Sequence, residues 1–278
     1  QLQPAQVSRA FKTGVKPVFR LETGLGRTIR ATANHKFLTL SGWKRLDELE
    51  PGMRIAQPRS LVGPEVQKMA DAELALLGHL IGDGCTLPRH AIQYTTREAD
   101  LAQHVTKLAE EIFGDALTVR VKKERTWFQV YLSSAQRLTH GVHNPITDWL
   151  TDLNVFGLRS YEKRVPESVF IQSTSGIAVF LRHLWATDGC IRLVGRKSVR
   201  PAIYYATSSR QLAQDVQSLL LRLGINARLA RCSQGDKGRD QFHVIVSGKP
   251  EWLHFLDTVG TIGAYKTASA QEIRQHHS

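Results

Sequence analysis

The sequence lacks the features that mark membrane, secreted and metal–thiolate proteins. No apolar run approaches the length of about 18 residues that a membrane helix needs, and no charged-then-apolar leader is visible. The three cysteines, Cys85, Cys190 and Cys232, show no C-x-x-C spacing and leave an odd thiol. We therefore expect neither a zinc site nor a disulfide framework, but buried reduced thiols in a cytoplasmic protein without a membrane partner.

Acidic residues are also in the minority. Lys and Arg total 37 against 25 Asp and Glu in 278 residues, a formal net charge of +12. A hydrophobic content of 42% is enough for a sizeable core in one large domain or two ordinary ones. The positive balance favours a polyanionic partner over an acidic small molecule, and nucleic acid is the first hypothesis.

The hydrophobic pattern changes along the chain. Residues 1–60 alternate apolar and polar side chains in short runs broken by glycines, which predicts a β-rich domain. Residues 61–71, with Gly63 and Pro64, are a plausible linker. Helix-length apolar segments begin after it, so a second domain is expected from residue 72.

This second domain repeats once. The segment from Ile81 to Cys85 is repeated from Ala186 to Cys190 at an offset of 105 residues. The next two repeated segments keep the same order at an offset of 111, and the last, which contains Lys163 and Lys266, lies at 103 to 104. We expect an α+β fold of two αββαββα units, 72–166 and 167–270, with a tail at 271–278. The inner helices are predicted at 97–113 and 209–223, the later strands at 116–122, 126–132, 226–232 and 241–247, and the terminal helices at 145–154 and 250–259.

Residues 76–84 and 181–189, LLGHLIGDG and LRHLWATDG, resemble the paired motifs of the LAGLIDADG homing endonucleases. The resemblance implies two pseudo-twofold-related units that form a DNA-binding saddle, with Asp83 and Asp188 at its centre. It also implies two or three Mg²⁺ ions held by these acids with Gly82 and Thr187. An isolated Asp-Gly is usually a cap or a turn, but the repeated pair favours catalysis.

Elementary chemistry agrees with this interpretation. Gly78 and Gly82 lie on one helix face and lack side chains, so a partner helix can approach closely. His183 corresponds to Gly78 in the repeat, where the family has a small residue, and we expect it to loosen that helix contact.

The Asp-Gly pair that ends each motif suits a helix that stops at a glycine in the left-handed conformation. Paired carboxylates repel each other unless a divalent cation lies between them.

Two lysines recur after the acids. Lys163 and Lys266 follow Asp83 and Asp188 by 80 and 78 residues, and they resemble the lysines that intein endonucleases place near the cleavage centre. A cation there can stabilise charge on the phosphate or tune the attacking water. The alternative is an ordinary solvated lysine.

Basic residues gather on the predicted strands. Charges on one sheet face would neutralise phosphates of double-stranded DNA and associate the protein with the nucleoid, although most charge runs are simply solvated. The candidates are Arg120, Lys122, Lys123, Arg125, Arg192, Arg196, Lys197, Arg200, Arg228 and Arg231.

The N-terminal part contains a Thr-x-x-His block. Residues 26–39 and 42–49 resemble the splicing block of inteins inserted in the replicative helicase DnaB, and Thr32, Asn34 and His35 would polarise the scissile amide. The resemblance implies a partial, all-β Hint-type domain. Inteins begin with Cys or Ser and end in His-Asn, whereas this chain begins at Gln1 and ends at Ser278, so we expect no splicing by the chain itself.

Three hypotheses follow. The first is a monomeric, site-specific endonuclease that makes a Mg²⁺-dependent double-strand break at an intein-less allele. The second is a catalytically inactive LAGLIDADG DNA-binding protein, which the intact acids disfavour. The third, protein splicing as the only live function, is disfavoured by the chain ends.

Overall fold

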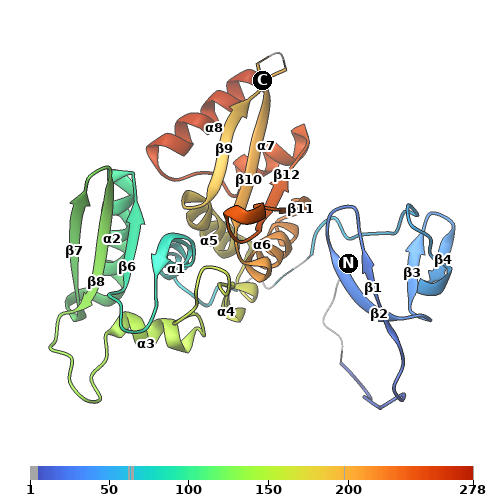
Figure 1. The fold of residues 1–278 in the computed structure, drawn as a ribbon, viewed down its shortest axis with the longest axis horizontal. Coiled ribbons are helices and arrows are strands. Elements are labelled where there is room, and N and C mark those ends of the chain that lie inside the picture. The colour runs from blue at the N-terminus through green and yellow to red at the C-terminus, as the bar shows by residue number, and fades with distance from the viewer. Residues whose placement is uncertain (1–5, 62, 64–65, 197, 278) are drawn as a thin grey trace.

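The computed structural model describes residues 6–61, 63, 66–196 and 198–277. Two units, each with a four-stranded antiparallel sheet, lie on either side of a central helix pair, and an N-terminal β segment lies at the right of Figure 1. The expected mixture of helices and sheets is confirmed. In the described part of the chain, no helix combines the length and the hydropathy that crossing a membrane requires.

Unit one follows the predicted order. It consists of α1 (Asp71–Asp83), β5 (Gly84–Cys85), β6 (Gln93–Thr96), α2 (Ala99–Phe113), η2 (Gly114–Ala116), β7 (Leu117–Glu124), β8 (Trp127–Ser134) and α3 (Pro145–Asp152). Its sheet has the order β5-β6-β8-β7.

Unit two repeats this arrangement and adds helices. It consists of α4 (Glu167–Phe170), α5 (Thr174–Ala186), β9 (Gly189–Val194), β10 (Arg200–Thr207), α6 (Arg210–Arg222), β11 (Ala227–Cys232), η3 (Gly235–Lys237), β12 (Gln241–Val246), α7 (Lys249–Thr258) and α8 (Ala264–His277). Its sheet order, β11-β12-β10-β9, is the sheet order of unit one, so the repeated words lie on repeated topology.

Each sheet buries one face. Tyr94 pairs with Val130 in unit one, Tyr205 pairs with Val244 in unit two, and all four side chains are fully buried. Helices α2 and α6 pack on these inner faces. Because side chains alternate along a strand, the opposite face carries the polar positions.

Helices α1 and α5 form the contact between the two units. A methyl group added at Gly78 would lie 2.8 Å from the Leu184 amide nitrogen and from the Phe180 carbonyl oxygen. The two backbones therefore nearly touch, as the glycine spacing predicts. The expectation that His183 loosens the contact is wrong, because the helices meet beside it: the methyl group at Gly78 would also lie 3.0 Å from His183 Cβ.

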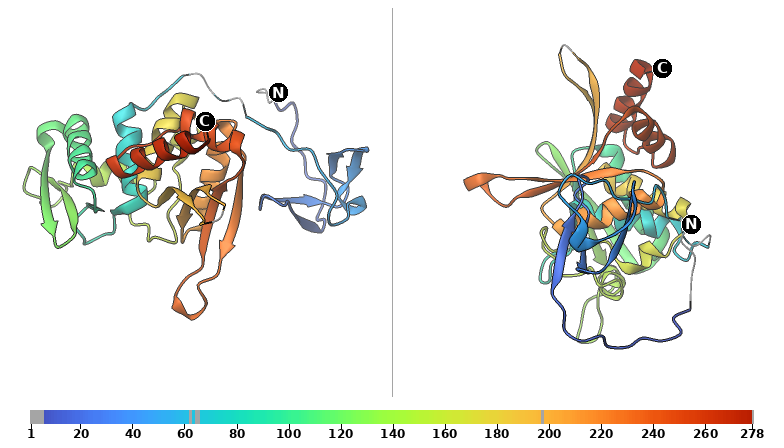
Figure 2. Two further views of the ribbon diagram at one scale, coloured as in Figure 1. Left: turned by 90° about the horizontal axis from the view of Figure 1, so that it is seen from above. Right: turned by 90° about the vertical axis from the view of Figure 1, so that its right-hand side faces the viewer.

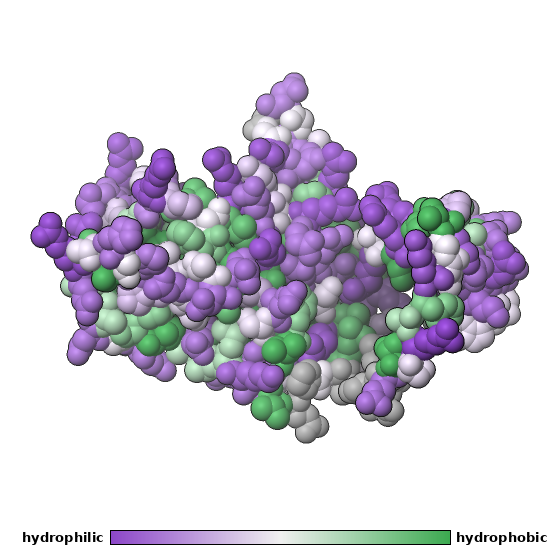
Figure 3. Space-filling view, turned by 90° about the horizontal axis from the view of Figure 1, so that it is seen from below, coloured by the Kyte–Doolittle hydropathy of each residue, from purple (hydrophilic) through white to green (hydrophobic). Residues whose placement is uncertain are grey.

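The N-terminal segment consists of two small hairpins. It contains β1 (Val18–Glu22), β2 (Thr28–Thr32), β3 (Lys36–Thr39), β4 (Gly42–Arg45) and η1 (Leu46–Glu48). Large hydrophobic side chains such as Phe19 and Trp43 are exposed on it, and hydrophobic patches are visible at the right-hand end of Figure 3. Isolated hairpins are marginally stable, so contacts with the second domain matter here.

Hydrogen bonds join this segment to unit two. The Leu229 amide of edge strand β11 donates to the Leu25 carbonyl at 2.9 Å, and the Gln217 amide group donates to the same carbonyl at 2.9 Å. The Arg27 guanidinium donates to the Gln217 carbonyl at 3.2 Å. In the left view of Figure 2 the segment lies at the right-hand end, beside the two units. Its Hint-type character stays a prediction.

Two expectations about detail are wrong. Residues 271–277 are not a tail, because α8 continues through them and buries Ile273 completely. The cysteines are free, as expected, but Cys85, Cys190 and Cys232 are half-buried rather than buried.

Candidate active site

The two motif acids lie at the same end of the central helix pair. Asp83 is the last residue of α1, and Asp188 lies two residues beyond the end of α5. A methyl group added at Gly82 would lie 2.0 Å from the Thr187 hydroxyl oxygen, so the two units approach each other closely beside these acids. The structure thus brings together the residues that the repeat pairs.

The surroundings of the acids disfavour their ionised forms. Burial, with the charge of Asp188 added, raises the pKa of Asp83 to about 6 against the opposing effect of Lys163 and Lys266. Burial also raises the pKa of Asp188. Both aspartates are nevertheless exposed to solvent, so an ion can reach them. A divalent cation would compensate two such carboxylates.

Gly84 and Gly189, which follow the two acids, do not form the expected left-handed helix caps. Gly84 has a φ of −81° and a ψ of 139°, which is extended backbone, and Gly189 has no positive φ, so the left-handed cap is wrong. Their role is steric. A methyl group at Gly84 would lie 2.3 Å from the Leu80 carbonyl oxygen, and one at Gly189 would lie 2.3 Å from the Trp185 carbonyl oxygen.

The two lysines cap the C-terminal ends of the motif helices. The Lys163 ammonium donates to the carbonyls of Gly82 at 2.6 Å and Gly84 at 3.0 Å. Lys266 donates to the carbonyls of Trp185 and Ala186 at 2.6 Å and of Thr187 at 2.9 Å. Orphan carbonyls and the negative end of a helix dipole favour a cation at this place. Burial lowers the pKa of Lys163, and that of Lys266 to about 8.

The two lysines differ in the number of N–H groups that remain free to donate a hydrogen bond. Three donated bonds use all three N–H groups of Lys266, which is 7% exposed. Lys163 donates two within the described residues and keeps one N–H for a water or a phosphate oxygen. Lys163 is therefore the better placed of the two to act on a substrate.

We expect Lys266→Met to lower the free energy of unfolding by about 1–3 kcal/mol, because buried carbonyls at the end of α5 lose their donor. Lys163→Met should cost less, since it leaves fewer carbonyls unpaired. Urea titrations of both variants measure this difference. Equal midpoints for Lys266→Met and the unsubstituted protein would contradict the capping role.

Oxygen donors around the acids fit a hard divalent cation. The carboxylates supply the charge that Mg²⁺ prefers, and an open pocket of about 790 Å³ lined by Asp83, Thr187 and Lys266 meets this end of the helices. The carbonyls of Gly82 and Thr187 already accept lysine N–H groups, although each keeps a second lone pair. The fit therefore depends on the carboxylates, and metal binding by Gly82 and Thr187 stays a prediction.

In unit one, the predicted basic residues do not share one face. Arg120 and Lys122 are exposed on the outer face of β7, where the Arg120 guanidinium lies 4.8 Å from the Tyr131 ring centroid and Lys122 forms an ion pair with Glu124. Lys123 lies opposite Phe128 on the other face. Arg125 stands at the hairpin turn with a φ of 46°.

In unit two, three arginines share the outer face. Arg192, Arg200 and Arg228 are exposed at outward positions of β9, β10 and β11. Arg231 lies on the opposite face of the sheet and forms an ion pair with Asp240. Arg196 is exposed in a loop, and Lys197 lies outside the described residues.

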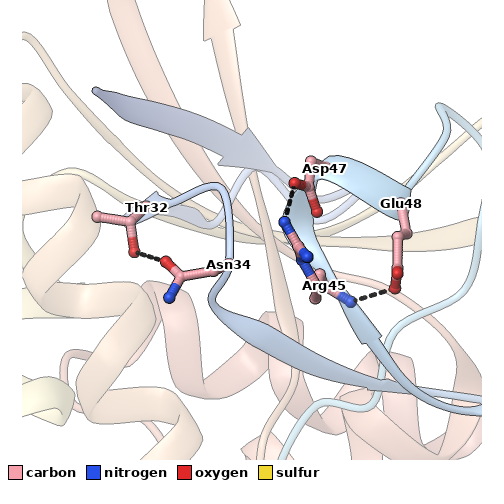
Figure 4. A network of polar contacts seen from close by, with 5 residues as sticks. All are labelled: Thr32, Asn34, Arg45, Asp47 and Glu48. Atoms are coloured by element: carbon pink, nitrogen blue, oxygen red, sulfur yellow. Dashed lines mark hydrogen bonds and ion pairs between the residues drawn. The ribbon is translucent and has the colours of Figure 1, made fainter. Parts of the chain in front are cut away.

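The predicted splicing residues lie close together at the end of β2. The Thr32 hydroxyl donates to the Asn34 side-chain oxygen at 2.8 Å (Figure 4). The His35 amide donates to the Thr32 carbonyl at 3.0 Å, which closes the turn. Nearby, Arg45 binds Asp47 through its side chain and Glu48 through its backbone amide (Figure 4). The roles of Thr32, Asn34 and His35 stay predictions.

Sequence reasoning missed two groups near the acids. Tyr94 and Tyr205 lie inside the sheets, and burial followed by the charge of the aspartates raises the pKa of both. Both stand at equivalent positions of the repeat, which was the available signal. A cluster of three histidines lies beside α1 and α5, and no pattern in the sequence joins them.

Known proteins resemble this chain in sequence over nearly its whole length. The chain is 58% identical over its whole length to a replicative DNA helicase DnaB of Rhodothermus marinus and 58% identical over 99% of its length to that of Synechocystis sp., and it spans 30% and 32% of those relatives. It is 25% identical over 94% of its length to a replication factor C small subunit of Methanocaldococcus jannaschii, of which it spans 13%.

Among solved structures, the chain is similar to I-DmoI in complex with DNA and Mn, with 14% identity and a TM-score of 0.48 over 69% of this chain and 97% of that one. Full-length WhiA of Thermatoga maritima gives 10% identity and a TM-score of 0.45 over 77% and 63%. The family description that matches is "LAGLIDADG-like domain", over residues 175–260. This match includes Asp188 and all of α5 except its first residue.

Proposed function

We propose that the chain is the site-specific endonuclease part of an intein and that it makes a metal-dependent double-strand break at an intein-less allele. The observation that supports this most directly is the delivery of Asp83 and Asp188 to one end of the paired helices. Two neighbouring acids repel each other, and this repulsion costs folding free energy. A role in the fold alone therefore does not explain why both are present.

The residues have separate tasks in this proposal. Asp83 and Asp188 would hold divalent cations, which would supply an activated water and stabilise the leaving oxygen of a phosphodiester. Lys163 keeps the end of α1 in place and directs its remaining N–H toward the scissile phosphate. Lys266 positions the end of α5 through its three carbonyl contacts.

The duplication of the unit determines the expected symmetry of the DNA target. Both units belong to one chain, so a monomer supplies two half-sites and a pseudo-palindromic or asymmetric duplex fits it best. The outer faces of the two sheets, with Arg120 in one and Arg192 in the other, are the surfaces that contact DNA. Such a protein would associate with the nucleoid.

Plasmid cleavage tests the proposal. The full chain is incubated with a plasmid that carries the uninterrupted helicase-gene insertion site, in Mg²⁺ and in EDTA. Linear product in Mg²⁺ alone is the expected result. Tight binding without cutting in Mg²⁺ would instead support the second hypothesis, a DNA-binding protein without catalysis.

Salt dependence tests the DNA-contacting face. Each phosphate that the protein no longer neutralises lowers the slope of log K against log salt by about 0.9, so Arg192→Gln should reduce it by roughly that amount. Arg231→Gln is the matched control, because this exposed arginine faces the other way and is paired with Asp240. Fluorescence anisotropy with a duplex at several salt concentrations gives both slopes, and equal slopes would contradict the assignment of the face.

A further inference from the structure

Three histidines from both units meet beside the central helices. His79 lies on α1, His104 on α2 and His183 on α5, and one ring nitrogen of each lies within 4.8 Å of those of the other two. His79 Nε2 and His183 Nδ1 are 3.0 Å apart. His79 and His183 are buried, whereas His104 is half-buried.

The duplicated fold does not require this cluster. At the offsets of the repeat, Leu184 corresponds to His79 and Asp215 corresponds to His104. Unit two therefore fills the same places with different chemistry. Apolar side chains would pack the core at lower cost, because buried polar rings need partners. Within the described residues, His104 Nε2 is buried and has no hydrogen-bond partner.

We propose that His79, His104 and His183 bind one divalent transition-metal ion, for which Zn²⁺ is the probe, and that this ion joins the two units. Imidazole nitrogen suits zinc and related ions, whereas Mg²⁺ prefers oxygen. Three histidines leave a fourth position for solvent, as in many zinc sites. The ion would therefore be distinct in class from the one that the carboxylates hold.

The protonation state of the cluster suits a metal. Burial is the main cause that lowers the pKa of all three histidines, that of His183 to about 3. Neutral rings have the lone pair that a ligand needs. His79 Nδ1 lies 3.2 Å from the Tyr94 hydroxyl. A proton on Nδ1, donated to that hydroxyl, leaves Nε2 free and fixes the ring.

Two of the three ligands are in place and the third must turn. Tetrahedral zinc with bonds of about 2.0–2.1 Å separates its nitrogens by roughly 3.3 Å, close to the spacing of His79 and His183. The His104 ring is stacked on that of His183 at 5.1 Å and 12°. Because the lone pair lies in the ring plane, His104 rotates when the ion binds, and its half-exposed side gives the ion a path inward.

Charged groups of both signs lie near the cluster. Lys266 lowers the pKa of His79 and Arg182 lowers that of His183, so both would repel a cation. At His104, Lys107 lowers the pKa, whereas Asp100 and Glu111 raise it. The two acids would therefore favour a cation on the half-buried side of the cluster.

Zinc titration of the full chain tests the site without Mg²⁺ or DNA. After EDTA treatment and dialysis, isothermal titration should show one Zn²⁺ per chain and a higher melting temperature. His104→Ala should weaken the affinity at least tenfold while it melts like the unsubstituted protein in EDTA. His276→Ala is the matched control for an exposed histidine in the C-terminal helix, and it should bind Zn²⁺ normally.

Two further measurements keep the test independent of that variant. Tyr94→Phe should weaken zinc affinity about 10–100-fold through loss of the orienting hydrogen bond. Co²⁺ in the unsubstituted protein should give the intense visible absorption of a tetrahedral site. No stoichiometric binding, unchanged affinity in His104→Ala, or weak octahedral Co²⁺ absorption would each overturn the proposal. Because DNA is absent, a failure of cleavage would leave this result unaffected.

Discussion

Asp83→Asn and Asp188→Asn should each reduce double-strand cleavage by about 10³-fold or more. A bound metal contributes several kcal/mol to the transition state, and each 1.36 kcal/mol corresponds to a factor of ten. Asparagine keeps the shape of the side chain but loses the charge that holds the cation. Single-turnover cleavage in Mg²⁺ measures the effect, with Asp148→Asn as the control because Asp148 is an exposed acid on α3.

These variants should remain folded. Burial and the neighbouring Asp188 raise the pKa of Asp83 to about 6, so its ionised form opposes folding above that pH. Removal of the charge should leave the melting temperature near pH 7.5 unchanged or higher, while DNA binding persists. Full cleavage by Asp83→Asn would remove this residue from the reaction, and a lower melting temperature would show that the acid stabilises the fold.

Much of the second domain is predictable because it repeats. The recurring Asp-Gly motifs correctly indicate two units. Alternation along the strands places Arg120 and Arg192 on the outer faces, but it places Lys123 and Arg231 on the inner ones, against the prediction. Glycine spacing also predicts the close approach of α1 and α5. These features follow from local or periodic sequence patterns, so they can be predicted from a single sequence.

Features that depend on tertiary contact escape such reasoning. Residues 271–277 are rich in polar side chains, yet they continue α8, in which Ile273 is fully buried. The capping role of Lys266 depends on carbonyls about 80 residues earlier. His79, His104 and His183 come from three helices, and nothing in their spacing indicates that their rings meet.

Gly82→Ala should lower the free energy of unfolding by about 1–3 kcal/mol, the usual cost of overpacking. Alanine is favoured over glycine in a helix by roughly 0.5–1 kcal/mol, so a net loss means that the clash dominates. The added methyl group would lie 2.0 Å from Thr187 Oγ1 and 2.5 Å from Thr187 Cβ. Gly176→Ala is the matched helical control, because its methyl group would meet the flexible end of Gln67 at 2.8 Å.

A double-mutant cycle isolates this contact. Thr187→Gly removes every Thr187 atom that the new methyl group would meet, so the penalty of Gly82→Ala should shrink in that background. An unchanged penalty would mean that the contact is not its cause. In Gly82→Ala the cleavage rate should fall by more than the loss of folding stability explains. A misplacement of about 1 Å at an active site costs roughly 10²-fold in rate. Gly82 adjoins Asp83, so separation of the helices moves one acid away from the other.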